Sequence, residues 1–420
     1  MKFTSDREII EILEKAIKKN GTVQDLATNK LIGEGENFTG TLLEAKFTFV
    51  DDETKEESHH NFIIKFPNEK SFLYEMGKLW RIYEKEVLVY ESLFPSVYEW
   101  QKNTFGFVKY QLPVPSVYLT TIDHNIIVME NLKLKNYDME PRQRGRNFAE
   151  CKLVMEKTAE FHGILQAYLQ SFETEEEFHK QHPYLTNLTK EVMEPMLNPP
   201  NAAEEKRKVY IPLMEILTKE YSDDKELLEN FLKHTENNDC LFATEKSYFK
   251  SENFNVIAHG DLWNNNILFK KAEDGTPLDC KLLDLQIMRY VTPADDISHF
   301  LWVSASLEVM SSDLKVMQKI YYDKLESVMK ELNSELTFTL QEFQEECKQF
   351  YKDKLQLSIV STIMMYASKD KAVSANVEDA DDDVMKEFSK IAQMLTLNME
   401  ENVKDRLMGI IRIAKDLGLF

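Results

Sequence analysis

Glycine and cysteine are both scarce in this chain of 420 residues. Only 12 residues are glycine, against a usual share of roughly 7%, so a glycine cluster here marks a conformational need of the backbone. The four cysteines lie far apart in the sequence, which excludes a closely spaced zinc or dithiol motif and a disulfide scaffold. We therefore expect reduced thiols, as in the cytoplasm.

Long apolar stretches are lacking as well. The best candidate, Ile297–Leu307, is far shorter than the ~20 apolar residues of a membrane-spanning helix. Residues 1–8 carry charges where a secretion signal would be apolar. These features predict a cytoplasmic protein without a membrane partner.

Positive charge is in deficit. Lys and Arg number 51 against 72 Asp and Glu, which gives a formal net charge of −21. Binding along a nucleic-acid backbone needs a basic face, so the composition argues against a nucleic acid as the main partner. A small anionic ligand in a locally basic site is compatible with the same composition.

Residues 1–131 have the pattern of a small lobe of mixed structure. Residues that favour β-structure predict strands over Leu42–Val50 and Phe62–Pro67, with a polar turn between them. Apolar positions that share one face predict a helix over Met76–Leu93. Two further short strands are expected over Val114–Tyr118 and Asn125–Met129.

Residues 132–420 are dominated by helical periodicity. Helices are expected over Phe148–Ser171, Ala202–Lys219, Leu227–His234, Ser304–Leu332, Leu340–Met365 and Val384–Leu417. Two strand-like stretches, Val256–Ala258 and Leu278–Leu283, interrupt them. We therefore predict an α+β fold of two lobes, a small N-terminal sheet lobe and a large, mainly helical C-terminal lobe.

The densest group of polar residues follows the first of these two strands. His-Gly-Asp, ending at Asp261, leads into three asparagines that end at Asn266, and such a run favours a loop. A second carboxylate, Asp284, stands at the end of the next apolar strand. Each segment alone is explained by a tight turn or a cap, but together they supply a base and oxygen ligands for Mg²⁺, as phosphoryl transfer requires.

A lysine in the small lobe adds a third element. Lys65 lies on an otherwise apolar strand, and a solvent-facing lysine is the ordinary explanation for such a position. Glu86, beside apolar positions of the next helix, is a possible partner, and a Lys–Glu pair of this kind fixes an ammonium against phosphates. The upstream glycines Gly33, Gly35 and Gly40 predict a turn that covers a triphosphate.

The order of these residues is similar to that of the aminoglycoside-phosphotransferase and choline-kinase branch of the kinase-like superfamily. More narrowly, His-Gly-Asp-Leu-Trp-Asn-Asn-Asn-Ile-Leu-Phe, followed by Leu-Leu-Asp-Leu-Gln, resembles the ecdysteroid kinase-like (CHK kinase-like) family. Trp263, the asparagines and Gln286 are the specific features. The resemblance runs from about Asp25 to the final helices and implies a two-lobed protein-kinase-like fold.

The resemblance implies a role for each matching residue. Asp261 would accept the proton of the acceptor hydroxyl, Asn266 would hold Mg²⁺, and Asp284 would bridge metal and phosphates. Lys65 would pair with the phosphates and with Glu86. The implied nucleotide contacts also include the covering loop and the hinge, whose residues are Gly35, Asn37, Phe38 and Thr39, and Glu130, Asn131 and Leu132.

The sequence differs from the usual family pattern at two positions, and two of its histidines are expected to support the site. Asn131 stands where the family usually has Asp, which backbone recognition of adenine tolerates, and Thr39 stands where Ser is frequent. His259 is expected to brace the catalytic loop, and His162 is expected to have a structural role.

The leading hypothesis is an ATP-dependent, Mg²⁺-requiring kinase that acts on a small-molecule alcohol. The family name implies an ecdysteroid or a hydroxylated xenobiotic, with choline-like or aminoglycoside-like acceptors as alternatives. No Ala-Pro-Glu segment follows Asp284, which favours a small-molecule acceptor over a protein. A catalytically silent nucleotide- or ligand-binding protein is the second hypothesis. A metal-dependent hydrolase using His259, Asp261 and Asp284 ranks last, because too few histidines have metal spacing.

Overall fold

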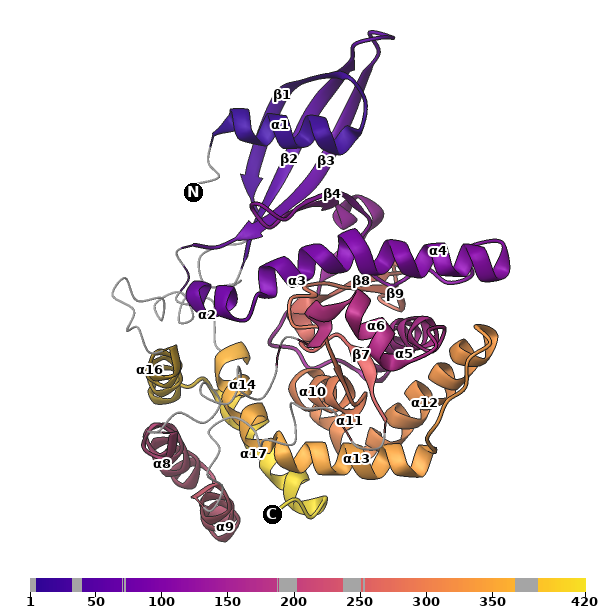
Figure 1. Cartoon of the computed structure of the whole chain (residues 1–420). Coiled ribbons are helices and arrows are strands. Elements are labelled where there is room, and N and C mark those ends of the chain that lie inside the picture. The colour runs from indigo at the N-terminus through magenta and orange to yellow at the C-terminus, as the bar shows by residue number, and fades with distance from the viewer. Residues whose placement is uncertain are drawn as a thin grey trace.

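The chain folds into a small sheet lobe that stands on a larger helical lobe (Figure 1). The computed structural model describes residues 5–31, 40–69, 71, 73–186, 188, 202–236, 251, 254–366 and 384–420. The predicted α+β class and the two-lobed arrangement are confirmed. None of the helices within these ranges is long and apolar enough to cross a membrane.

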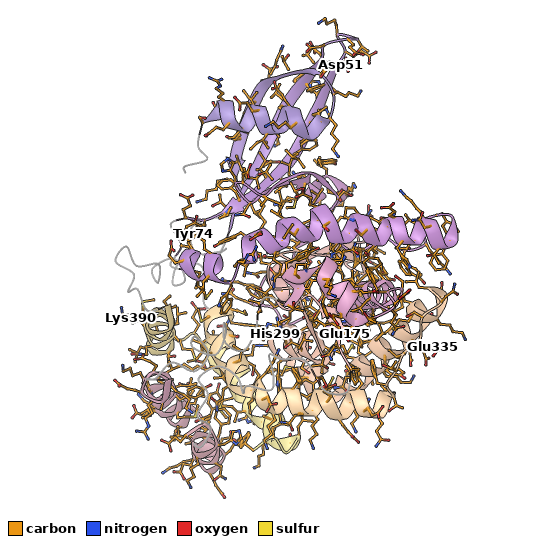
Figure 2. The ribbon with its side chains drawn as sticks, viewed as in Figure 1. Asp51, Tyr74, Glu175, His299, Glu335 and Lys390 are labelled. Atoms are coloured by element: carbon orange, nitrogen blue, oxygen red, sulfur yellow. The ribbon has the colours of Figure 1, made fainter. Side chains whose placement is uncertain are left out.

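The small lobe is built on one antiparallel sheet of order β1-β2-β3-β5-β4. Its strands are β1 (Gly21–Lys30), β2 (Gly40–Asp51), β3 (Glu57–Pro67), β4 (Val117–Thr121) and β5 (Ile126–Glu130). Helix α1 (Asp6–Ile17) begins with a capping box formed by Ser5 and Glu8 and packs on one face of the sheet. Asp51 ends β2 near the tip of the β2–β3 hairpin (Figure 2).

The two faces of this sheet have different neighbours. On one face Phe62 and Ile64 join α1 in a separate hydrophobic cluster, whereas Ile63 belongs to the large core that continues into the helical lobe. Because side chains alternate along a strand, Lys65 shares the face of Ile63. The sheet therefore directs Lys65 toward the helical lobe.

The prediction of one continuous helix over Met76–Leu93 is wrong, because two α-helices and a π-helical turn occupy this range. Helix α2 (Tyr74–Leu79) ends before Arg81, which has a left-handed backbone with φ +54, and α3 (Ile82–Leu88) begins after it. A single π-helical turn, Val89–Leu93, then leads into α4 (Phe94–Phe105). Two contacts that no periodicity encodes set the direction of α3: Lys85 donates to the backbone oxygen of Met288, and Glu86 binds Lys65.

In the helical lobe, helices surround five short strands that form two small sheets. Its strands are β6 (Tyr137–Met139), β7 (Val256–Ala258), β8 (Ile267–Lys271), β9 (Pro277–Leu282) and β10 (Arg289–Val291), with β6-β8-β9 and β7-β10 as sheets. Its helices are α5 (Phe148–Leu169), α6 (Glu175–Gln181), α8 (Ala202–Glu220), α9 (Lys225–Glu236), α10 (Ala294–Ser304), α11 (Leu307–Ser312), α12 (Leu314–Glu331), α13 (Leu340–Asp353), α14 (Leu355–Tyr366), α16 (Val384–Leu397) and α17 (Glu401–Asp416).

Several predicted boundaries differ from the observed ones. The three longest predicted helices are each interrupted, at Asp313, at Lys354 and between α16 and α17. At Lys354 the break lets the ammonium form an ion pair with buried Asp295 on α10, a tertiary contact invisible to periodicity. Strand β1 was not predicted, because apart from Val23 its side chains are exposed or half-buried and no alternation marks it.

The packing of α1 predicts how strongly this helix stabilises the sheet. Leu13 is fully buried against the sheet, so Leu13→Ala should lower the free energy of unfolding by about 2–5 kcal/mol. Lys15→Ala, on the exposed face of the same helix, should change it by less than about 0.5 kcal/mol. Urea denaturation followed by circular dichroism measures both, and equal losses in the two variants would contradict the packing described.

Candidate active site

A tight loop between β7 and β8 carries the predicted catalytic motif. Gly260 has φ +87, and a Cβ atom there would lie 2.2 Å from the backbone oxygen of Ile287. Only glycine fits that conformation and that space. The glycine therefore lets the loop pass close to the segment that follows Asp284.

His259 connects this loop to the neighbouring strand end. Its Nδ1 accepts a hydrogen bond from the backbone N–H of Asp261 at 3.2 Å, so the proton is assigned to Nε2, which donates to the Leu283 backbone oxygen at 2.8 Å. Burial lowers the pKa of this histidine, which keeps the ring neutral. His259 thus braces the loop.

Asp296, on the first turn of α10, holds the same loop from the other side. Its carboxylate accepts the backbone N–H groups of His259 at 2.7 Å and Gly260 at 2.8 Å. His162 lies 3.0 Å from the same carboxylate through Nε2 and 2.7 Å from the Tyr321 hydroxyl through Nδ1. Although burial opposes ionisation, the bond to His162 lowers the pKa of Asp296. Sequence reasoning missed Asp296, because two acidic residues at a helix start are an ordinary feature.

The Asp261 carboxylate is held at one of its two oxygens. Oδ2 accepts hydrogen bonds from the Asn266 side-chain amide at 2.9 Å and from the Trp263 indole N–H at 3.3 Å. Burial and the Asp284 carboxylate raise the pKa of Asp261 to about 6, although 37% of its side chain is exposed. The group is still mostly ionised at neutral pH and can accept a proton.

Asp284 follows β9 in a constrained conformation. Its backbone is left-handed with φ +65, and its neighbours are fixed on both sides. The Leu283 N–H donates to the Asn266 backbone oxygen at 2.8 Å, and the Leu285 N–H donates to Glu86 at 3.3 Å. The two polar segments singled out in the sequence are therefore hydrogen-bonded neighbours, and Asp284 and Asn266 could both contribute oxygens to a metal ion.

Lys65 joins the two lobes at this point. Its Nζ lies 2.7 Å from Glu86 and 2.9 Å from Asp284, and only 7% of its side chain is exposed. Burial alone would lower the pKa of Lys65, but the carboxylates of Asp284 and Glu86 outweigh it and raise that pKa. The structure thus brings together Lys65, Glu86 and Asp284 beside the loop that carries Asp261.

The structure describes the predicted hinge but not most of the predicted covering loop. The glycines Gly33 and Gly35 and the loop residues Asn37, Phe38 and Thr39 lie outside the described residues. Glu130 is the last residue of β5, and Asn131 and Leu132 follow it. The side chains of all three are buried, so a ligand here would meet backbone atoms.

The contacts of the Asn131 side chain explain why Asn suits this position of the predicted hinge better than Asp. Its amide nitrogen donates to Glu44 at 3.1 Å and to the side-chain oxygen of Asn61 at 3.0 Å. Asn61 also donates to Glu44 at 2.9 Å, and this bond, with the nearby Lys46, lowers the pKa of Glu44. An aspartate at position 131 would lose both donations and face an anionic Glu44.

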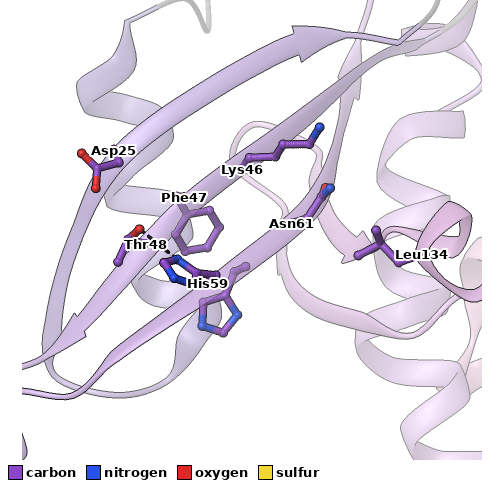
Figure 3. A pocket seen from close by; sticks show the side chains of 8 residues that line it. Asp25, Lys46, Phe47, Thr48, His59, Asn61 and Leu134 are labelled. Carbon is purple, nitrogen blue, oxygen red and sulfur yellow. Dashed lines mark hydrogen bonds between the residues drawn. The ribbon is translucent and has the colours of Figure 1, made fainter.

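A cavity of about 390 Å³ lies farther along the same sheet (Figure 3). Thr48, bonded to His59, lies on its wall, and Leu134 approaches from the helical turn Leu132–Lys135. Its other lining residues are Asp25, Lys46, Phe47, His60 and Asn61. None of the predicted site residues lines it, so we place the candidate active site at Asp261 and Asp284 on chemical grounds.

The Asn131 contacts generate a stability prediction. Asn131→Asp should destabilise the protein by about 2–4 kcal/mol, because two hydrogen bonds are lost and two carboxylates become neighbours. Adding Glu44→Gln should recover part of the loss, since the amide that it introduces can donate to the new carboxylate. Urea midpoints of the two single variants and the double variant measure the coupling. If Glu44→Gln does not relieve the loss of stability in Asn131→Asp, the proposed interaction between positions 44 and 131 is contradicted.

The matched family agrees with the geometry of the site. Residues 34–334 match the ecdysteroid kinase-like family, and this range contains Lys65, Glu86, Asp261, Asn266 and Asp284. A comparison with curated proteins found no match. The matched range covers well over half of the chain and extends over parts of both lobes. The chain therefore belongs to the ecdysteroid kinase-like family.

Proposed function

We propose that this protein is an ATP-dependent kinase that transfers the γ-phosphoryl group to a hydroxyl of a small, lipophilic alcohol. One observation carries the proposal: the Lys65 ammonium binds Glu86 and Asp284 at once, next to the loop that holds Asp261. Membership of a kinase-like family supports a small-molecule phosphotransferase. The five polar positions that such chemistry requires are all filled.

Each residue would have a distinct part in this reaction. When bound, Mg·ATP supplies the phosphoryl group, which forms a bond to the acceptor oxygen as its bond to the bridging β–γ oxygen breaks. Lys65, oriented by Glu86, would neutralise phosphate charge. Asp261 would orient the acceptor hydroxyl and take its proton. Catalysis would then depend on positioning and charge neutralisation.

The donor set fits Mg²⁺ that is shared with phosphates. The Asn266 amide nitrogen donates to two oxygens of Asp261, so its amide oxygen faces away from that carboxylate and is open to a metal. Asp284 uses one carboxylate oxygen for Lys65, which leaves the other for a metal. Within the described ranges, no group of three or more His, Cys, Asp or Glu could hold a metal by itself. Mg²⁺ typically completes such a set with phosphate and water oxygens.

The acceptor is proposed from the family description alone. An ecdysteroid or a hydroxylated xenobiotic is the first choice, and choline and an aminoglycoside are the acceptors to compare with it. A catalytically silent nucleotide-binding protein is the competing function.

Thermal unfolding tests the nucleotide site first. Mg·ATP at ~100 times its dissociation constant stabilises a protein by about 2.7 kcal/mol, so the wild-type protein should melt a few degrees higher with it. Asp284→Ala should lose this shift, whereas Asp274→Ala, exposed on the β8–β9 turn, should keep it. A wild-type protein that shows no shift with any divalent metal would overturn the nucleotide site.

Phosphate transfer from labelled ATP tests the chemistry. Ecdysone, choline and kanamycin serve as probe acceptors. Asp261→Asn should lower the transfer rate by about 10²–10⁴-fold, because the amide cannot accept the proton, while the Mg·ATP shift persists. An undiminished rate would remove Asp261 from the role of base. Binding without transfer in the wild type would favour the silent protein.

A further inference from the structure

Helix α10 is buried along its length except at His299. The other ten residues of the helix are all buried, and 12% of the His299 side chain is exposed (labelled in Figure 2). The helix is held at its start by Asp295, which forms ion pairs with Arg289 and Lys354. His299 therefore lies on a firmly held helix, and a small part of its polar side chain reaches the surface.

The His299 side chain lies beside Asp261. The His299 Nε2 atom is 3.9 Å from Asp261 Oδ1, too long for a direct hydrogen bond. Oδ2 of the same carboxylate is already occupied by Asn266 and Trp263. Among the residues that the structure describes, Oδ1 accepts no hydrogen bond and neither ring nitrogen of His299 has a hydrogen-bond partner. One oxygen atom between the two groups would satisfy both.

The protonation state of the His299 imidazole suits such a contact. Burial and the positive charge of Lys354 lower the pKa of His299 to about 3, whereas that of Asp261 lies near 6. His299 is therefore neutral at physiological pH, with one N–H donor and one acceptor nitrogen. A mostly buried imidazole without a partner costs free energy unless a ligand or water supplies one.

We propose that His299 is an acceptor-binding residue, which donates a hydrogen bond from Nε2 to the hydroxyl oxygen whose proton Asp261 Oδ1 accepts. This inference rests on the proposed kinase function and deepens it. With its hydrogen held by Asp261 and one lone pair held by His299, the hydroxyl keeps its other lone pair for the phosphorus. The pair also selects hydroxyls over protonated amines, because an ammonium has no lone pair to accept the N–H.

Two variants of His299 separate a hydrogen bond from simple space filling. His299→Phe removes the donor and keeps a ring, whereas His299→Gln places an amide N–H close to the position of Nε2. With labelled ATP, transfer is measured to ecdysone and, in its absence, to water. His299→Phe should lower kcat by about tenfold to a hundredfold, with the KM for ATP and the Mg·ATP melting shift unchanged, and His299→Gln should recover most of the rate.

Each other outcome overturns the inference in a recognisable way. A His299→Phe rate within twofold of wild type shows that the hydrogen bond is not used. A His299→Gln protein that folds, with a wild-type melting temperature, and is as slow as His299→Phe indicates a role in shape alone. A wild-type protein that transfers phosphate neither to water nor to ecdysone, choline or kanamycin removes the proposed kinase function, and this inference with it. An active wild type with an unaffected His299→Phe removes only this inference.

Discussion

The site depends on one buried ammonium that needs carboxylates from two distant parts of the chain. A charge as buried as that of Lys65 is tolerated only with close, oppositely charged partners. Glu86 comes from α3 and Asp284 from the end of β9, so satisfying Lys65 fixes how the sheet lobe, α3 and the helical lobe meet. The left-handed break at Arg81 directly precedes α3, the helix from which Glu86 reaches Lys65.

Around this ion pair, several backbone groups of the catalytic loop are held by residues from outside the loop. Asp296 takes two of its N–H groups, and His259 ties it to the residue before Asp284. Beside these contacts, Asp261 Oδ1 and the His299 ring face each other at 3.9 Å, and the described residues supply neither with a hydrogen-bond partner. A rigid support beside open hydrogen-bonding groups is what a site for orienting a small hydroxyl requires.

Position 131, in the predicted hinge, shows how the choice between two similar residues is decided by their surroundings. Backbone contacts to a nucleotide would tolerate either Asp or Asn at position 131, so a motif comparison does not distinguish them. The choice is made by Glu44 on β2, whose negative charge requires a donor from its neighbour. Asn131 is thus explained by a residue 87 positions away, which no local pattern in the sequence indicates.

Local patterns in the chain were enough to predict the α+β class, most of the elements and the short motifs that carry Lys65, Asp261, Asn266 and Asp284. Periodicity and turn chemistry are local, so they can be recognised without knowing what packs against them. Only the tertiary structure showed the helix breaks at Arg81 and Lys354, the support that Asp296 gives to the catalytic loop, and the position of His299 beside Asp261. These features arise because buried polar groups must find partners, and those partners come from segments that are remote in the sequence.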